Sequence, residues 1–119
     1  MTAHVTWILD MRVADGQLDA LTRLMNEMSA STEKHEPGTL AYEWSLSADG
    51  TTCHLYERYA DSAAAMLHIA TFGEKYATRF MDLLTPTRFL LYGSPDASVR
   101  NALAAFGPTY MAPAAGFFR

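Results

Sequence analysis

Residues 40–59, LAYEWSLSADGTTCHLYERY, have the pattern of two β-strands joined by a tight turn. From residue 40 to residue 46 every second side chain is a large aliphatic or aromatic group, which is the period of a strand. Asp49-Gly50 interrupts the alternation, and Asp-Gly between two such runs is a strong hairpin signal. We therefore predict a β-hairpin whose second strand covers about residues 52–59.

A strand and a helix precede this hairpin. Residues 4–12 carry apolar side chains at a spacing of two, as a strand does. Apolar residues at three- and four-residue steps from Leu18 to Met28 predict an amphipathic helix. Asp15 is the expected N-cap of this helix, and Pro37-Gly38 ends it.

A second helix and a further strand follow the hairpin. Asp61 or Ser62 can cap the helix, which is expected to run to about Leu84 with a break at Gly73. TRFLLYG at residues 87–93 then predicts a fourth strand.

The resulting order predicts an α+β, ferredoxin-like β-α-β-β-α-β fold. Its four-stranded antiparallel sheet would carry both helices on one face. We expect a single domain at residues 1–119, with a core at about 4–94 and a C-terminal helix and tail at 95–119. Pro95 suits the first turn of that helix. The tail is apolar, so we expect it to pack on its own domain or on a neighbouring chain.

Composition argues against several classes of function. Nine Lys and Arg against thirteen Asp and Glu give a net charge of −4, which disfavours binding to nucleic acid or an anionic membrane. No apolar run approaches the roughly 18 residues of a membrane span, and the N-terminus lacks the features of a signal peptide. With a single cysteine, Cys53, the chain is expected to be cytoplasmic and to have no internal disulfide.

Both faces of the predicted sheet carry bulky side chains, although helices cover only one of them. Trp7 lies beside Ile8 in the first strand, and Leu55 lies beside Tyr56 in the third. An uncovered apolar patch on this scale usually marks an interface. We therefore expect a homodimer whose sheets pack face to face. The alternative is a monomer in which the C-terminal tail covers that face.

Two stretches, EPGTLAYEW at residues 36–44 and YERYADSAAAMLHIATF at residues 56–72, resemble the antibiotic biosynthesis monooxygenase family. The resemblance covers about residues 4–94 and implies a dimeric α+β barrel. The extra helix and the terminal GFFR resemble the quinol monooxygenase branch. The family includes cofactor-free oxygenases of polycyclic phenols, quinol oxidases, haem-degrading enzymes and an isomerase, so the resemblance alone does not name a reaction.

His68 is the candidate catalytic residue. A lone histidine beside an apolar helical stripe is commonly a hydrogen-bonded core residue, whereas the family resemblance implies a pocket residue that accepts a proton. Glu57 shares a strand face with Leu55 and Tyr59 and is expected to support His68 as its partner. The alternative is a structural ion pair between Glu57 and an arginine: Arg58, Arg79 or Arg88.

Aromatic side chains are the candidates for binding a flat substrate through stacking and tyrosine hydroxyls. They are Trp7, Tyr42, Trp44, Phe72 and Tyr76. The four histidines form no close ligand pair and no glycine-rich nucleotide loop is present, so neither a metal nor a cofactor is expected. Haem bound through His68 is the alternative that the resemblance leaves open.

The function expected from these features is a cofactor-independent monooxygenase or oxidase of a quinol-like or polycyclic phenolic aromatic, using O2. Such a substrate supplies its own electrons, so the protein needs a base, a dry pocket and hydrogen-bond donors. Two alternatives stay open on the same fold. One is a non-catalytic dimer that binds a small ligand, and the other is a haem-degrading or isomerase relative.

Overall fold

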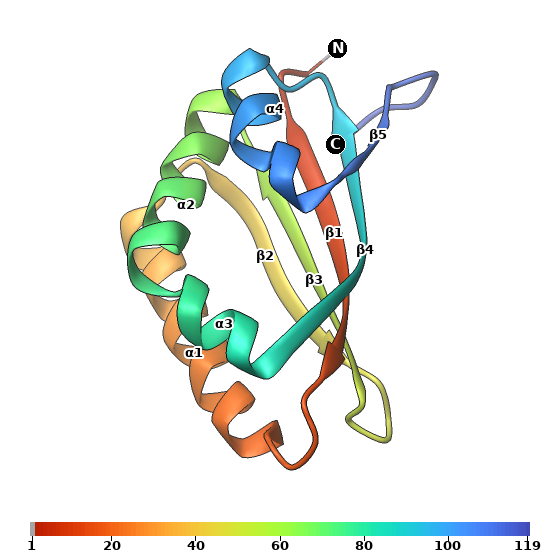
Figure 1. Cartoon of the computed structure of the whole chain (residues 1–119). Helices are drawn as coiled ribbons and strands as arrows, with labels where there is room; N and C mark the ends of the chain where they lie inside the picture. The colour runs from red at the N-terminus through yellow and green to blue at the C-terminus, as the bar shows by residue number, and fades with distance from the viewer. Residues whose placement is uncertain (1) are drawn as a thin grey trace.

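The computed structural model describes residues 2–119. Its elements are β1 (Val5–Val13), α1 (Leu18–His35), β2 (Thr39–Leu46), β3 (Thr52–Tyr59), α2 (Ser62–Lys75), α3 (Ala77–Leu83), β4 (Leu84–Gly93), α4 (Ala97–Leu103), a 3-10 turn (Ala104–Phe106) and β5 (Thr109–Met111). The helices lie on one side of a single twisted sheet (Figure 1). The α+β, ferredoxin-like prediction is therefore confirmed.

The sheet has five strands, not the four that we predicted. The strand order is β2-β3-β1-β4-β5. The first four strands pair antiparallel, whereas β5 pairs parallel to β4 with Tyr110 opposite Leu91. We expected the C-terminal segment to pack on the domain through its side chains. Its backbone also hydrogen-bonds to the otherwise open edge of β4 and so adds a strand. The sheet is consequently mixed.

The hairpin that defines the fold forms as predicted. Gly50 adopts a φ of +74°, a conformation that glycine accepts readily, and its N–H donates to the Ser47 carbonyl. The Asp49 carboxylate accepts hydrogen bonds from the Ser47 hydroxyl and from the Thr51 backbone. This closed turn sets the pairing that places Tyr42 opposite Glu57.

The second predicted helix is broken at Tyr76, not at Gly73. Gly73 lies inside α2 and faces open space, so it costs the helix only about 1 kcal/mol relative to alanine. Tyr76 separates α2 from α3 with a φ of −125°, and its side chain is buried. The change of direction lets Tyr76 and Phe80 both reach the core. Asp61 caps α2, as predicted, by accepting from the Ala64 N–H at 2.8 Å.

Two other predicted helix starts were wrong. Gln17, not Asp15, occupies the N-cap of α1 and makes no side-chain cap hydrogen bond. In α4 the cap is Asp96, which accepts from the Val99 N–H at 3.1 Å, so Pro95 precedes the cap and is not in the first turn. Both differences shift the helix start by one or two residues, the usual uncertainty of an end inferred from sequence.

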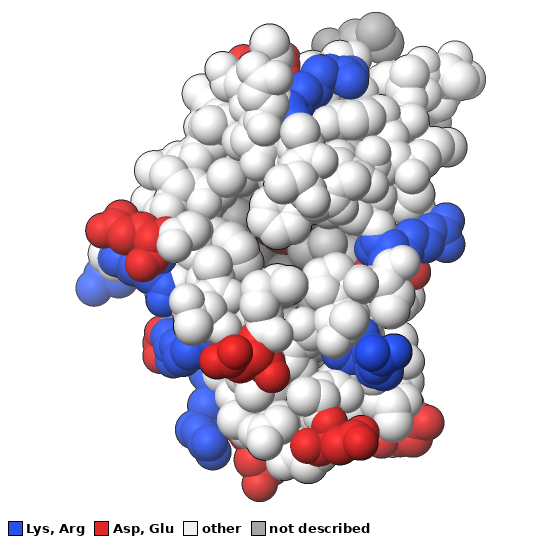
Figure 2. Space-filling model, in the orientation of Figure 1, with Lys and Arg blue, Asp and Glu red and all other residues white. Residues whose placement is uncertain are grey.

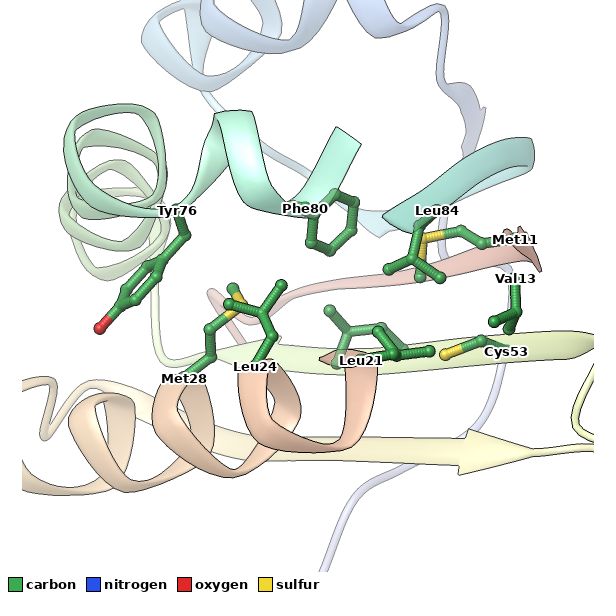
Figure 3. Packing of buried hydrophobic residues seen from close by; sticks show 10 residues of the cluster. Met11, Val13, Leu21, Leu24, Met28, Cys53, Tyr76, Phe80 and Leu84 are labelled. Carbon is green, nitrogen blue, oxygen red and sulfur yellow. The ribbon is translucent and has the colours of Figure 1, made fainter. Parts of the chain in front are cut away.

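Two hydrophobic clusters fill the layer between helices and sheet. In the first, side chains of α1 face those of α3 and the strands (Figure 3). Its buried members are Met11, Val13, Leu21, Leu24, Met28, Cys53, Leu55, Tyr76, Phe80 and Leu84. The second cluster lies between α2, α4 and the other end of the sheet and contains Val5, Trp7, Tyr59, Ala65, Phe89, Leu91, Val99 and Leu103. The candidate site lies where these clusters meet.

No helix covers the outer face of the sheet among residues 2–119 (Figure 1). Ile8, Tyr56, Leu90 and Tyr92 are half-buried there. The tail reaches this face through Phe118, whose ring centroid lies 3.6 Å from the Arg58 guanidinium carbon and 5.5 Å from the His4 ring. Phe118 nevertheless stays 58% exposed and Phe117 is 75% exposed, so the chain itself covers neither ring.

None of the helices in the described part of the chain is long and apolar enough to span a membrane.

Candidate functional site

His68 points from α2 into the layer between helix and sheet. The Asp61 cap fixes where α2 begins, and the three-residue step from Ala65 to His68 places both side chains on the buried face of the helix. His68 is only 6% exposed. The imidazole is therefore part of the interior.

Two buried carboxylates hold the imidazole, one at each nitrogen. His68 Nδ1 lies 2.8 Å from Glu36 Oε1, and His68 Nε2 lies 3.0 Å from Glu57 Oε1. Glu36 is 4% exposed and Glu57 is 2% exposed. Glu36 terminates α1, Glu57 lies in β3 and His68 lies in α2, so the three residues join three elements. We call them the Glu36–His68–Glu57 triad.

Neighbouring strands supply further donors to the triad. The Trp7 indole N–H donates to Glu57 Oε2 at 2.6 Å from the adjacent strand β1. The Tyr59 hydroxyl donates to Glu57 Oε1. The Thr39 hydroxyl donates to Glu36 Oε1 over a longer 3.4 Å. Buried carboxylates require such partners because an unpaired charge in the interior is very costly.

The triad fixes the protonation state of His68. Burial alone lowers the pKa of this imidazole, but the hydrogen bonds and negative charges of Glu36 and Glu57 outweigh burial and raise the pKa to about 9. At neutral pH the ring is therefore an imidazolium that donates through both nitrogens. The expected neutral base forms only at higher pH.

An apolar cavity of about 70 Å³ lies beside the triad. Its walls include Trp7, Phe72, Met81, Phe89 and Phe106, and His68 is the one titratable residue in its lining. The ring nitrogens of Trp7 and His68 already bind carboxylates, so the walls offer flat rings and aliphatic groups. Figure 2 shows this face of the molecule hollowed near its middle among uncharged side chains.

The structure separates the predicted substrate-binding residues into two groups. Trp7 and Phe72 line the cavity, whereas Tyr42, Trp44 and Tyr76 do not. The Tyr42 ring packs against His68 at a centroid distance of 5.5 Å, and Tyr76 belongs to the first hydrophobic cluster. The sequence pattern could not distinguish the cavity-lining residues from the others, because all five side chains point into the space between the helices and the sheet.

Tyr42 and Trp44 carry buried donors without a partner. Within residues 2–119 neither the Tyr42 hydroxyl nor the Trp44 indole N–H makes a well-aligned hydrogen bond, although the Trp44 side chain lies near the Tyr42 oxygen. Burial and then the nearby charge of Glu57 raise the pKa of Tyr42 well above its usual value, so its hydroxyl stays protonated. Both groups can donate to a bound molecule or a water that reaches them.

The sequence pattern paired Glu57 with His68 and placed Tyr59 on the same strand face, but it did not indicate that the Tyr59 hydroxyl binds Glu57 or that Glu36 belongs to the site. Glu36 was visible as the first residue of the Glu-Pro-Gly motif, but nothing local shows that its side chain turns inward. Among residues 2–119 no arginine pairs with Glu57, so the alternative ion pair is absent there. Arg58 instead donates to His4, and Arg79 pairs with Glu27.

The triad does not resemble a metal site. Among the described residues, no three His, Cys, Asp or Glu side chains are arranged to hold a metal ion. Binding of haem iron through His68 would require one carboxylate to release a ring nitrogen.

The fold and the site together define a class: an α+β, ferredoxin-like domain with a buried carboxylate–histidine cluster beside an apolar cavity. The sequence matches the family described as antibiotic biosynthesis monooxygenase over residues 5–72, more than half of the chain. The chain belongs to this family. Membership indicates a monooxygenase-like protein that binds a small molecule.

Solved structures share this fold. MupZ from Pseudomonas fluorescens is 23% identical with a TM-score of 0.84, and the match covers 98% of this chain and 94% of that chain. Rv0793 from Mycobacterium tuberculosis is 27% identical (TM-score 0.63, covering 80% and 98%), and PA3566 from Pseudomonas aeruginosa is 24% identical (TM-score 0.60, covering 76% and 91%). No curated protein matches the chain. The coverage of the MupZ match includes most of the C-terminal segment.

Proposed function

We propose that this protein is a cofactor-independent monooxygenase or oxidase of a quinol-like or polycyclic phenolic aromatic, using O2. The observation that carries the proposal is the apolar cavity with a buried, doubly paired histidine in its wall. Family membership supports the reaction class. The aromatic walls suit a flat substrate and exclude water from the reacting atoms.

The proposed chemistry needs little from the protein beyond proton transfer. In the oxidase reaction a quinol gives two protons and two electrons to O2, which yields a quinone and hydrogen peroxide. In the monooxygenase reaction an activated CH2 group of the substrate becomes a carbonyl, and the second oxygen atom leaves as water. In both reactions the first step removes a proton from the substrate, and the resulting anion supplies the electrons.

His68, supported by Glu57, is the proposed proton acceptor, and one carboxylate must release a ring nitrogen before the ring can take a proton from the substrate. A phenolic hydroxyl has a pKa near 10, and a base whose own pKa is about 9 is well matched to it. The consequence of this raised pKa is that only a small fraction of the His68 rings is neutral at pH 7. Turnover is therefore expected to rise with pH until about 9, and not to level off near 6.5. Tyr42 lies behind His68 and outside the cavity lining, so its hydroxyl is the proposed donor only to a substrate that extends past the imidazole.

Oxygen consumption with a panel of quinols and anthrone-type phenols tests this proposal. His68→Ala should lower turnover of a true substrate by about 10²–10⁴-fold, the usual contribution of a positioned base. His68→Gln should be impaired to a similar extent while remaining folded, because it cannot accept the proton. Full turnover by both variants would rule out His68 as the base.

The same experiment separates the alternative functions. Tight binding of an aromatic without oxygen uptake would identify a ligand-binding protein. A Soret band on addition of haemin, lost in His68→Ala, would identify a haem-binding relative.

We also propose that the protein is a cytoplasmic homodimer assembled through the outer sheet face. The half-buried Ile8, Tyr56, Leu90 and Tyr92 on that face support this assembly. Size-exclusion chromatography with light scattering should give about twice the chain mass of 13.2 kDa. A monomer at micromolar concentration would contradict the face-to-face arrangement.

A further inference from the structure

The two carboxylates of the triad are held very differently. Glu57 accepts three hydrogen bonds, from His68 Nε2, the Trp7 indole and the Tyr59 hydroxyl. These donors come from a helix and two adjacent strands, and all of them are buried. Both Glu57 oxygens are occupied, so this side chain is fixed to the sheet.

Glu36 is held more loosely. Its Oε1 atom accepts from His68 Nδ1 at 2.8 Å and from the Thr39 hydroxyl at 3.4 Å, whereas Oε2 has no hydrogen bond to the described residues. Glu36 is the C-cap of the 18-residue helix α1. A carboxylate at the negative end of a helix lies in an unfavourable field. A cation beside it compensates, and His68 is the group in that position.

Among residues 2–119, the hydrogen bonds, ion pairs and ring contacts of His68 involve no cationic side chain. Glu36 faces it from the end of α1, Tyr42 from β2, and Glu57 and Tyr59 from β3. The ring is thus surrounded by acidic or neutral groups, and its charge is controlled by the two carboxylates.

We propose that Glu36 is a positioning residue that keeps the His68 ring protonated and aligned at the cavity wall, while Glu57 anchors the ring to the sheet. The consequence for turnover rests on the proposed function. The effect on the imidazole itself does not, because it can be observed without substrate. Glu36 therefore contributes, together with the fixed Glu57, to setting the pH range in which His68 is able to accept a proton.

Glu36→Gln is the decisive variant, because the amide oxygen can still accept from Nδ1–H but carries no charge. NMR titration of the histidine rings, with the His68 signal assigned by its loss in His68→Gln, reports the protonation directly. Removal of one adjacent charge should lower the midpoint for His68 by about 1–3 pH units. Glu36→Asp, which restores the charge, should recover much of the difference. If the enzyme turns over a quinol, the rising limb of the pH–rate profile should move down by the same amount.

Glu27→Gln is the matched control, since Glu27 also lies on α1 but pairs with Arg79 at the exposed surface. It should leave the His68 midpoint unchanged. Glu57→Gln should instead lower the melting temperature more than Glu36→Gln, because the amide keeps only one acceptor oxygen and places an NH2 group against one of the donors that bind Glu57. A folded Glu36→Gln protein with the wild-type His68 midpoint would overturn the proposal. So would an equal loss of melting temperature in the two variants.

Discussion

The first hydrophobic cluster and the Glu36–His68–Glu57 triad lie in the same layer between helices and sheet, but different forces hold them. The cluster depends on non-directional burial of aliphatic and aromatic groups such as Leu24 and Phe80. The triad depends on directional contacts at fixed atoms. A cluster can relax around a small change, whereas a buried charge that loses its partner has no comparable substitute. The stable part of the core and the chemically specialised part are therefore distinct.

Removal of Glu57 should have the largest effect on stability. Glu57→Ala leaves the His68 charge and the Trp7 and Tyr59 donors without their common partner, and breaking a buried pair in this way costs about 3–5 kcal/mol. Urea denaturation at pH 7 measures the loss. A loss below 1 kcal/mol would show that water replaces the carboxylate and that the triad resembles an exposed ion pair.

Leu24→Ala should be the matching change in the hydrophobic cluster. Leu24 is 2% exposed, and its truncation should cost about 2–5 kcal/mol through lost burial and the cavity that remains. The His68 titration should not change, because Leu24 is not among the residues that hydrogen-bond to the His68 ring or pack their rings against it. If the midpoint moved by a full pH unit, the two regions would have to be treated as one coupled core.

The stability of the fold should depend on pH through His68. Its folded pKa of about 9 lies above its ordinary value of 6.5, so the stabilisation is fully present below pH 6.5 and is lost as pH rises through about 9. The free energy of unfolding should therefore fall by on the order of 3 kcal/mol between pH 6.5 and a pH above 9. Unfolding free energies between pH 6 and 10 should show this decline in the wild type. In His68→Gln the decline within this window should disappear, and its persistence would assign it to other groups.

The contact between the tail and the outer sheet face should contribute least. Phe118→Ala removes the ring above Arg58, an exposed cation–π contact worth about 0.5–1 kcal/mol. Thermal denaturation should show a small decrease, with Phe117→Ala as a neutral control because Phe117 is largely exposed. If both variants instead lose more melting temperature, and the loss depends on protein concentration, the tail contacts a second chain.

The elements that depend on local pattern were predictable. The alternation in β1, β2 and β3, the Asp49-Gly50 turn and the Asp61 cap all follow from contacts within a few residues. The position of the helix break was not predictable from local pattern. Gly73 has the lower helix propensity, but the buried Tyr76 is where α2 ends and the chain changes direction. Local propensity was overridden by tertiary packing.

The order of elements and the inward side of the strand that carries Glu57 follow from the amino-acid sequence alone, whereas Leu40 and Leu46 of the β2 pattern are exposed. Periodicity determines these features because each depends on neighbours along the chain. Three features emerge only in the folded chain. Glu36 contacts His68, which is 32 positions away in the sequence, and β5 adds a fifth strand to the sheet. The cavity is lined by Trp7 and Phe72 but not by Tyr42 and Trp44. The physical reason is that these features depend on where distant segments meet. The protonation of His68 is decided in the same way, because it follows from two charges that only the folded chain brings to one ring.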